Sequence, residues 1–142
     1  MKQRGFTVIE LLIVIAFLIF AGALFFVQKN NLEISTRDDK RKTAINAMYY
    51  SLEESFYKQN GYYPMTIDEK NLTTLDKALF TDPSGIKLGQ TTQKVDDEEE
   101  SVQSDYRYEP TNCSDNQCKG YSLRADLEGE ADYIKKSRAP TS

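Results

Sequence analysis

The sequence contains no histidine and only two cysteines among its 142 residues. Histidine is the commonest general base of enzymes and a common metal ligand, so its absence argues against acid–base and metal-dependent catalysis. Two cysteines without histidine cannot supply the four nitrogen or sulfur ligands of a structural zinc site. There is also no glycine-rich phosphate-binding loop. We therefore expect no enzyme activity, no catalytic residues, no metal and no cofactor.

The C-terminal two-thirds of the chain are acidic. From Thr43 onward there are eleven Lys or Arg against eighteen Asp or Glu, a net charge of −7, although the whole chain carries only −4. An acidic surface repels phosphate backbones, so we expect no binding of nucleic acid by the general surface. The length allows one modest globular domain beside a separate N-terminal segment.

That N-terminal segment is a long apolar run from Phe6 to Val27, interrupted only by Thr7 and Glu10. As a helix its 22 residues would span ~33 Å, about the thickness of the bilayer hydrocarbon. A secretory signal peptide, cut near Ala21-Gly22-Ala23, is the alternative. The length of the run and the carboxylate inside it argue against that alternative, because a charge within a membrane segment is costly and usually functional.

The first residues resemble the N-terminal signature of type IV prepilins, in which a short basic leader and a glycine precede Phe-Thr-x-x-Glu and an apolar helix. Here that stretch is Lys2-Gln3-Arg4-Gly5-Phe6-Thr7-Val8-Ile9-Glu10. The resemblance implies that residues 1–5 are a leader peptide. It also implies that a membrane-bound prepilin peptidase and methyltransferase cleaves between Gly5 and Phe6 and methylates the new amine of Phe6.

Glu10 is the residue on which assembly would depend. A carboxylate buried among lipid tails or packed helices is unfavourable unless a cation pairs with it. The amine of Phe6 lies four residues away and could pair within the same helix. The resemblance implies a second option, in which Glu10 meets the Phe6 amine of a neighbouring subunit. The alternative to both pairings is an unpaired Glu10 carboxylate that extends to the polar edge of the membrane.

One helix from Phe6 to Asn60 is predicted, because residues 28–60 contain neither proline nor glycine. Residues 6–28 form its transmembrane or filament-core half and residues 29–60 its amphipathic half, with Gly61 as the terminator. The apolar stripe of the second half comprises Ile45, Met48, Leu52 and Phe56, with Glu53, Glu54 and Lys58 off it. The charged block at residues 37–42 is expected to be a solvated helix surface or a source of subunit contacts.

Residues 61–142 are predicted to form a head with an antiparallel sheet, so the fold class is α+β and pilin-like. Alternating residues at 105–109 and 121–127 predict a hairpin whose loop, Pro110 to Gly120, contains Cys113 and Cys118. In an exported domain these cysteines predict a disulfide rather than two free thiols. We also expect a short helix at residues 72–79, a solvated mobile loop at residues 96–100, and a mobile tail from Gly129.

Three functions fit these observations. The first is a major pilin that polymerises with itself into a surface filament for adhesion, twitching motility or DNA uptake, with an assembly platform as its partner. The second is a pseudopilin of a type II secretion or competence apparatus, and the third is a singly anchored binding protein. Basic residues lie mostly on the C-terminal side of the apolar run, which by charge alone favours a cytoplasmic head. The prepilin resemblance implies the opposite: a precursor in the cytoplasmic membrane and an extracellular filament.

Overall fold

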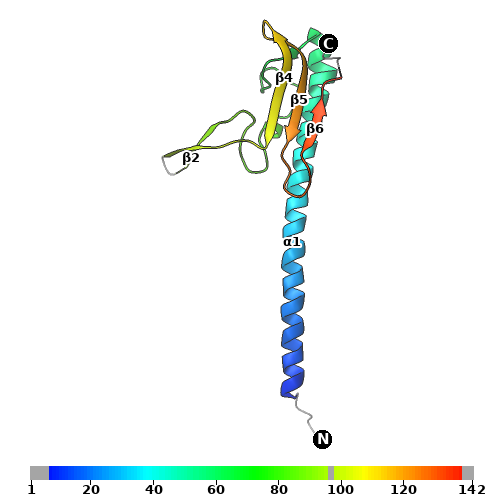
Figure 1. Cartoon of the computed structure of the whole chain (residues 1–142), viewed down its shortest axis with the longest axis vertical. Coiled ribbons are helices and arrows are strands. Elements are labelled where there is room, and N and C mark those ends of the chain that lie inside the picture. The colour runs from blue at the N-terminus through cyan, green and yellow to red at the C-terminus, as the bar shows by residue number, and fades with distance from the viewer. Residues whose placement is uncertain (1–6, 96–97, 139–142) are drawn as a thin grey trace.

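The computed structural model describes residues 7–95 and 98–138, without the side chains of residues 93–99. A single long helix carries a small antiparallel sheet along its C-terminal half, and its N-terminal half extends away from the head (Figure 1). This is the α+β, pilin-like arrangement that the sequence predicts.

The helix is continuous from Val8 to Asn60. It comprises α1 (Val8–Tyr50), a π-helical stretch η1 (Ser51–Tyr57) and a last turn α2 (Lys58–Asn60). Its 53 residues give a length of ~80 Å at 1.5 Å per residue. Gly61 ends it in the left-handed conformation, with φ of 75°, and donates its N–H to the Tyr57 carbonyl at 2.8 Å. Glycine adopts this conformation without a steric penalty, so the predicted end of the helix is confirmed.

The sheet is arranged around β5 (Gln117–Ala125). β4 (Tyr106–Ser114) runs antiparallel along the whole of β5. The two remaining strands also pair antiparallel with β5, β1 (Tyr63–Pro64) near its start and β6 (Tyr133–Lys136) near its end. Because β4 pairs only with β5 among the described residues, it is an edge strand.

The β4–β5 hairpin differs from the prediction. The expected loop from Pro110 to Gly120 is wrong, because the strands continue to Ser114 and resume at Gln117. Only Asp115 and Asn116 form the turn, and both have positive φ, 50° and 63°. Two-residue hairpin turns of type I′ require this at both positions, and Asp and Asn tolerate it best after glycine. Proline has no backbone N–H to donate to a neighbouring strand. Pro110 is tolerated within β4 because an edge strand has backbone nitrogens that need no hydrogen-bond partner in the sheet.

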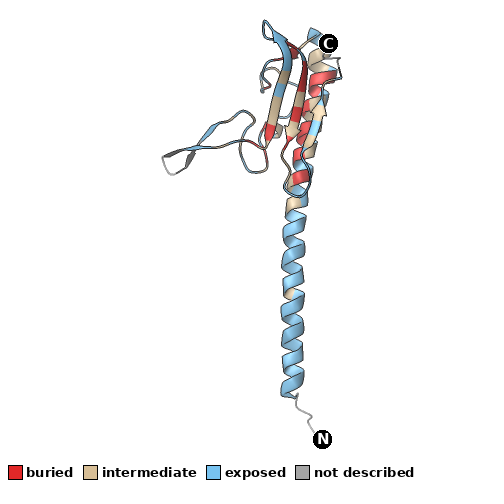
Figure 2. Ribbon diagram, in the orientation of Figure 1, coloured by how far each residue is buried: buried red, intermediate tan, exposed pale blue. Residues whose placement is uncertain are grey.

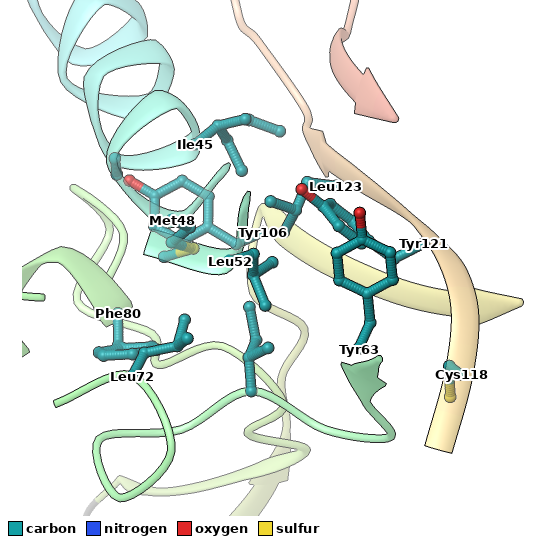
Figure 3. Packing of buried hydrophobic residues seen from close by; sticks show 13 residues of the cluster. Ile45, Met48, Leu52, Tyr63, Leu72, Phe80, Tyr106, Cys118, Tyr121 and Leu123 are labelled. Atoms are coloured by element: carbon teal, nitrogen blue, oxygen red, sulfur yellow. The ribbon is translucent and has the colours of Figure 1, made fainter. Parts of the chain in front are cut away.

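The core lies where the helix meets the sheet (Figure 3). The helix contributes the predicted stripe, of which Ile45, Met48 and Leu52 have no exposed surface, while Phe56 is partly buried. The sheet contributes aromatic rings, and Tyr63 and Tyr121 meet edge to face with centroids 4.7 Å apart. Burial of each such side chain stabilises the fold by about 1.5–3 kcal/mol. The buried apolar residues are Ala44, Ile45, Met48, Leu52, Tyr63, Ile67, Leu72, Phe80, Tyr106, Cys118, Tyr121, Leu123 and Ala125.

Three predicted features of the head are corrected. The expected helix at residues 72–79 is only a 3₁₀ turn, η2 (Lys77–Phe80), which Asp76 caps by accepting the N–H of Ala78 at 3.0 Å. The expected mobile tail contains β6, so it is part of the sheet. The expected acidic loop is partly a hairpin, in which β2 (Thr92–Val95) pairs with β3 (Glu98–Ser101); Asp96 and Asp97 lie outside the described residues.

Glu53, which the sequence places off the apolar stripe, is buried at 5 % exposure. Its carboxylate accepts hydrogen bonds from the hydroxyls of Tyr121 at 2.8 Å and Tyr63 at 3.0 Å, and from the backbone N–H of Arg138 at 3.2 Å. Three donors compensate the loss of hydration of a buried carboxylate. The residue therefore connects the helix, the sheet and the C-terminal segment.

Candidate assembly site

The helix begins with a cap at Thr7. This residue has extended backbone, with φ of −76° and ψ of 151°, and its hydroxyl accepts the N–H of Glu10 at 3.4 Å. Thr-x-x-Glu is the capping-box spacing, a local signal for the start of a helix. The cap fixes the start of the helix at Val8 and places Glu10 in its first turn, where the positive end of the helix dipole favours a carboxylate.

The N-terminal half of the helix has no covering surface within the chain. Large apolar side chains from Val8 to Val27 are exposed on every side, for example Val8 at 78 % and Phe26 at 72 %. Residues 7–33 are all exposed except Gly22, which is intermediate, and Figure 2 shows this half of the helix in the colour of exposed residues. It is long and apolar enough to cross a membrane, by length and composition. Exposed apolar surface of this extent indicates a membrane or protein partner.

The predicted site residues are only partly visible. Gly5 and Phe6, the predicted processing and methylation positions, lie outside the described residues. Glu10 is described and exposed, and no ion pair within residues 7–95 and 98–138 involves it. The pairing of Glu10 with a Phe6 amine, in its own chain or a neighbour's, therefore stays a prediction.

The head is fastened to the helix by a cluster of charged residues that we call the latch: Arg37, Asp38, Arg41, Asp105 and Glu128. Arg41 is buried and reaches three carboxylates, Glu128 at 2.7 Å, Asp105 at 2.8 Å and Asp38 at 3.0 Å. Arg37 also pairs with Glu128, at 2.5 Å. The expectation of a solvated surface at residues 37–42 is thus wrong for Asp38 and Arg41, both 2 % exposed. Their burial follows from the loop between β5 and β6, which covers them.

Electrostatics within the latch favour the charged forms. Hydrogen bonds from Arg37 and Arg41 lower the pKa of Glu128 to about 2. Burial by itself would raise the pKa of Asp38, but the backbone N–H groups of Glu128 and Gly129, at 2.9 and 2.8 Å, together with Arg41 lower it below its ordinary value. Both carboxylates are therefore ionised at neutral pH, which keeps the buried guanidinium paired.

Comparison with known protein families identifies the N-terminal segment of the chain. Residues 1–25 match the family model described as the prokaryotic N-terminal methylation motif. The chain carries the type IV prepilin signature. No curated protein and no solved structure matches the chain. The signature supports a type IV pilin-like or pseudopilin protein, and it implies processing by a prepilin peptidase followed by pilus assembly. Together with the apolar helix it fits a membrane-anchored precursor.

The two cysteines of this prepilin-type chain form a disulfide, Cys113–Cys118. They are directly opposite each other on β4 and β5, and one residue on each strand separates them from the turn. The predicted disulfide is therefore confirmed, and it joins the two neighbouring strands beside the turn. Within the described residues no group of three or more Cys, His, Asp or Glu could hold a metal ion.

Sequence reasoning missed the latch and Glu53. The local indication of the latch was the alternating charge of residues 37–42, and an ordinary solvated helix shows the same alternation. Its partners Asp105 and Glu128 lie 64 and 87 residues further along the chain than Arg41. Local pattern contains no information about such distant partners.

Proposed function

We propose that the chain is the major pilin of a type IV pilus, a structural and non-catalytic subunit that polymerises into a surface filament. The observation that carries this proposal is the exposed apolar half of the helix with a single carboxylate, Glu10, in its first turn. In the precursor the membrane covers this half of the helix. In the filament, the same half of neighbouring subunits covers it.

The proposed order of events starts in the cytoplasmic membrane. A prepilin peptidase removes residues 1–5 and methylates the amine of Phe6, which leaves a cation at the start of the mature chain. An assembly platform then transfers the subunit to the growing filament. A subunit that docks at the wrong height leaves both Glu10 and a neighbour's amine without a partner in an apolar environment, which is unfavourable for each. Charge pairing therefore selects the axial register.

The latch and the core support the same function. A filament subunit must transmit force from its helical core to its head, so the two parts have to move as one body. The buried contacts of Ile45, Met48 and Leu52 with the sheet and the ion pairs of Arg41 hold the head on the second half of the helix. The first half is left free to pack with other subunits.

The test replaces Glu10 by alanine and counts filaments. Removal of the charge favours insertion into lipid, so Glu10→Ala should accumulate in the membrane and be processed normally. Filament number should nevertheless fall by at least tenfold, since loss of a desolvated ion pair costs about 3–5 kcal/mol. Mixed expression with the wild-type chain should show that Glu10→Ala subunits enter filaments poorly.

The matched control is Glu33→Ala. Glu33 lies on the same helix and is exposed, and its one ion pair among the described residues is with Lys29 at 3.7 Å, so this variant should assemble normally. Normal numbers of full-length filaments from a stable, processed Glu10→Ala chain would contradict the pairing mechanism. A gene deletion that blocks protein export and leaves surface filaments intact would favour the pseudopilin alternative. A lipid-bound monomer that keeps residues 1–5 would favour a simple membrane anchor.

A further inference from the structure

A stripe of regularly spaced side chains runs along both halves of the helix. In the C-terminal half it comprises the core residues Ile45, Met48 and Leu52, which pack against the head and have no exposed surface. The same intervals of three and four residues continue towards the N-terminus through Arg41 and Ile34. Side chains at these intervals stay on one side of a helix and drift round it by only ~20° for every seven residues. In the N-terminal half the stripe, which we call the front stripe, consists of Ile13, Phe17, Phe20, Leu24 and Val27.

The front stripe is exposed, although it continues the stripe that forms the core. Its members Phe17, Phe20 and Leu24 are 71, 65 and 51 % exposed. Figure 2 shows the change from buried positions, where the helix meets the head, to exposed positions along the N-terminal half. Side chains with this spacing pack as knobs into holes between the residues of a partner surface. The front stripe therefore requires a partner with a hole that accepts large apolar side chains.

A groove with such a hole lies on the other side of the helix, where the helix enters the head. Its walls are the helix and the segment that contains η2, and its volume is about 420 Å³. Thr36, on the helix wall, is nine residues before Ile45, which places it ~180° round the helix from the stripe at 3.6 residues per turn. The apolar side chains that line the groove are Ala44, Leu79, Pro83 and Tyr106. We call this cavity the back groove.

We propose that the back groove of one subunit receives the front stripe of a neighbouring copy of the same chain. This inference rests on the proposed polymerisation and names the surface of the head that a neighbour's helix enters. The stripe supplies exposed phenylalanines, and the groove supplies an apolar lining of sufficient volume. Because the two surfaces lie on opposite sides of one helix, their contact is heterologous. Heterologous contacts repeat from copy to copy and generate open helical assemblies, which is the symmetry that a filament needs.

The contact also determines which neighbour is involved. Phe20 of one copy must lie level with residues near Lys40 of the other, and the two positions are 20 residues apart. The two copies are therefore displaced by ~30 Å along the helix axis, at 1.5 Å per residue. The pairing of Glu10 with a neighbour's Phe6 amine requires a displacement of only ~6 Å. The groove contact and the charge pair must therefore involve two different neighbours of each subunit.

The experiment places a photoreactive benzoyl-phenylalanine at Ala78 of the full-length chain, in cells that lack the wild-type gene. Ala78 lines the back groove and is exposed, so the larger side chain should not disturb the fold. Irradiation of sheared filaments should link this position to the peptide of a second copy that contains residues 17–27, as identified by mass spectrometry. The matched control places the same group at Met65, which is 49 % exposed and lines a different cavity. It should give no link to residues 17–27.

Two substitutions in the front half of the contact separate the stripe from general hydrophobicity. Phe20→Ala and Phe26→Ala remove the same side chain from positions that are 65 and 72 % exposed, but only Phe20 belongs to the front stripe. Phe20→Ala should lower the yield of the Ala78 crosslink by about tenfold, the order of effect of losing one large buried apolar side chain. Phe26→Ala should leave that yield within about twofold of the wild-type value.

Failure of the inference is distinct from failure of the proposed function. If the wild-type chain forms no filaments, polymerisation itself is wrong. If it forms filaments but the group at Ala78 links only to its own chain or to the head of another copy, the back groove does not receive the helix. If the link to residues 17–27 forms but Phe26→Ala lowers its yield as much as Phe20→Ala does, the front stripe does not make the contact and the inference is overturned.

Discussion

Replacement of Arg41 by methionine tests whether the latch holds the head on the helix. Methionine keeps the length and flexibility of the arginine stem and removes the charge. In the wild-type chain the Arg41 and Asp38 side chains are both 3 % exposed. The substitution therefore leaves a carboxylate that is buried without its cation. Removal of one member of a buried ion pair typically costs about 3–5 kcal/mol.

Three features place the expected loss at the lower end of that range. Asp38 keeps two backbone hydrogen bonds, from the N–H groups of Glu128 and Gly129. Glu128 keeps its pair with Arg37. The Nε of Arg41 is buried without a partner, so its removal also removes an unfavourable group. We expect a loss of about 3 kcal/mol, which is a large share of the about 5–15 kcal/mol that stabilises a typical domain.

The assay is thermal unfolding of the full chain in detergent, followed by the near-ultraviolet circular dichroism of its tyrosines. For a head of this size about 3 kcal/mol corresponds to a fall of roughly 12 °C in Tm. The matched control, Lys42→Met, lies on the next helix position. In the described part of the chain it breaks one ion pair, with Glu130, whose side chain is 55 % exposed. That change should cost at most about 1 kcal/mol. Equal shifts for the two variants would refute the reasoning.

The latch also predicts how stability depends on pH. The folded-state pKa of Glu128, about 2, and that of Asp38 both lie below the ordinary values of 4.5 and 3.8. As pH falls, the unfolded chain therefore binds protons first. The contribution of these carboxylates should be complete above about pH 5 and should be lost as pH approaches about 2. Arg41→Met should lose less on acidification than the wild-type chain does.

Two further changes test other contacts of the head. Under denaturing, non-reducing conditions we expect no free thiol. Reduction of Cys113–Cys118 should destabilise the head by about 2 kcal/mol, which is the chain-entropy value for so small a ring. Quantitative labelling of both thiols before reduction would contradict the disulfide. At Gly129 a Cβ would lie 3.1 Å from Ile34 Cγ2 and 3.3 Å from Asp38 Oδ2. Gly129→Val should therefore lower Tm more than Gly129→Ala. An unchanged Tm for both variants would mean that this loop does not pack closely against the helix.

The helix could be predicted from the sequence because its determinants are local. Residues 28–60 contain no helix breaker, an apolar stripe recurs every three or four residues, and Gly61 supplies the left-handed end. The stripe from Ile45 to Leu52 is fully buried as predicted. The first turn of the helix could also have been placed, since Thr7 and Glu10 have the capping-box spacing.

The remaining features depend on partners that are distant in sequence. Asp38, Arg41 and Glu53 have the local pattern of solvated residues, and their burial is favourable because of partners distant in sequence, such as Asp105, Glu128 and Tyr121. β6 contains only four residues, two of them lysines, and it forms because the edge of β5 is available. Short edge strands of this composition have little local signal. The positions of Gly5 and Phe6 were predicted by resemblance, and their chemistry stays a prediction.

N-terminal mass spectrometry of material sheared from the cell surface tests the central claim most directly. Cleavage after Gly5 and methylation of the new amine should give a mature chain that begins at N-methyl-Phe6, recovered in filaments of micrometre length. A Gly5→Val variant, with a branched side chain at the cleavage position, should accumulate as the precursor and give no filaments. Sheared filaments whose subunits still begin at Met1 would contradict the account.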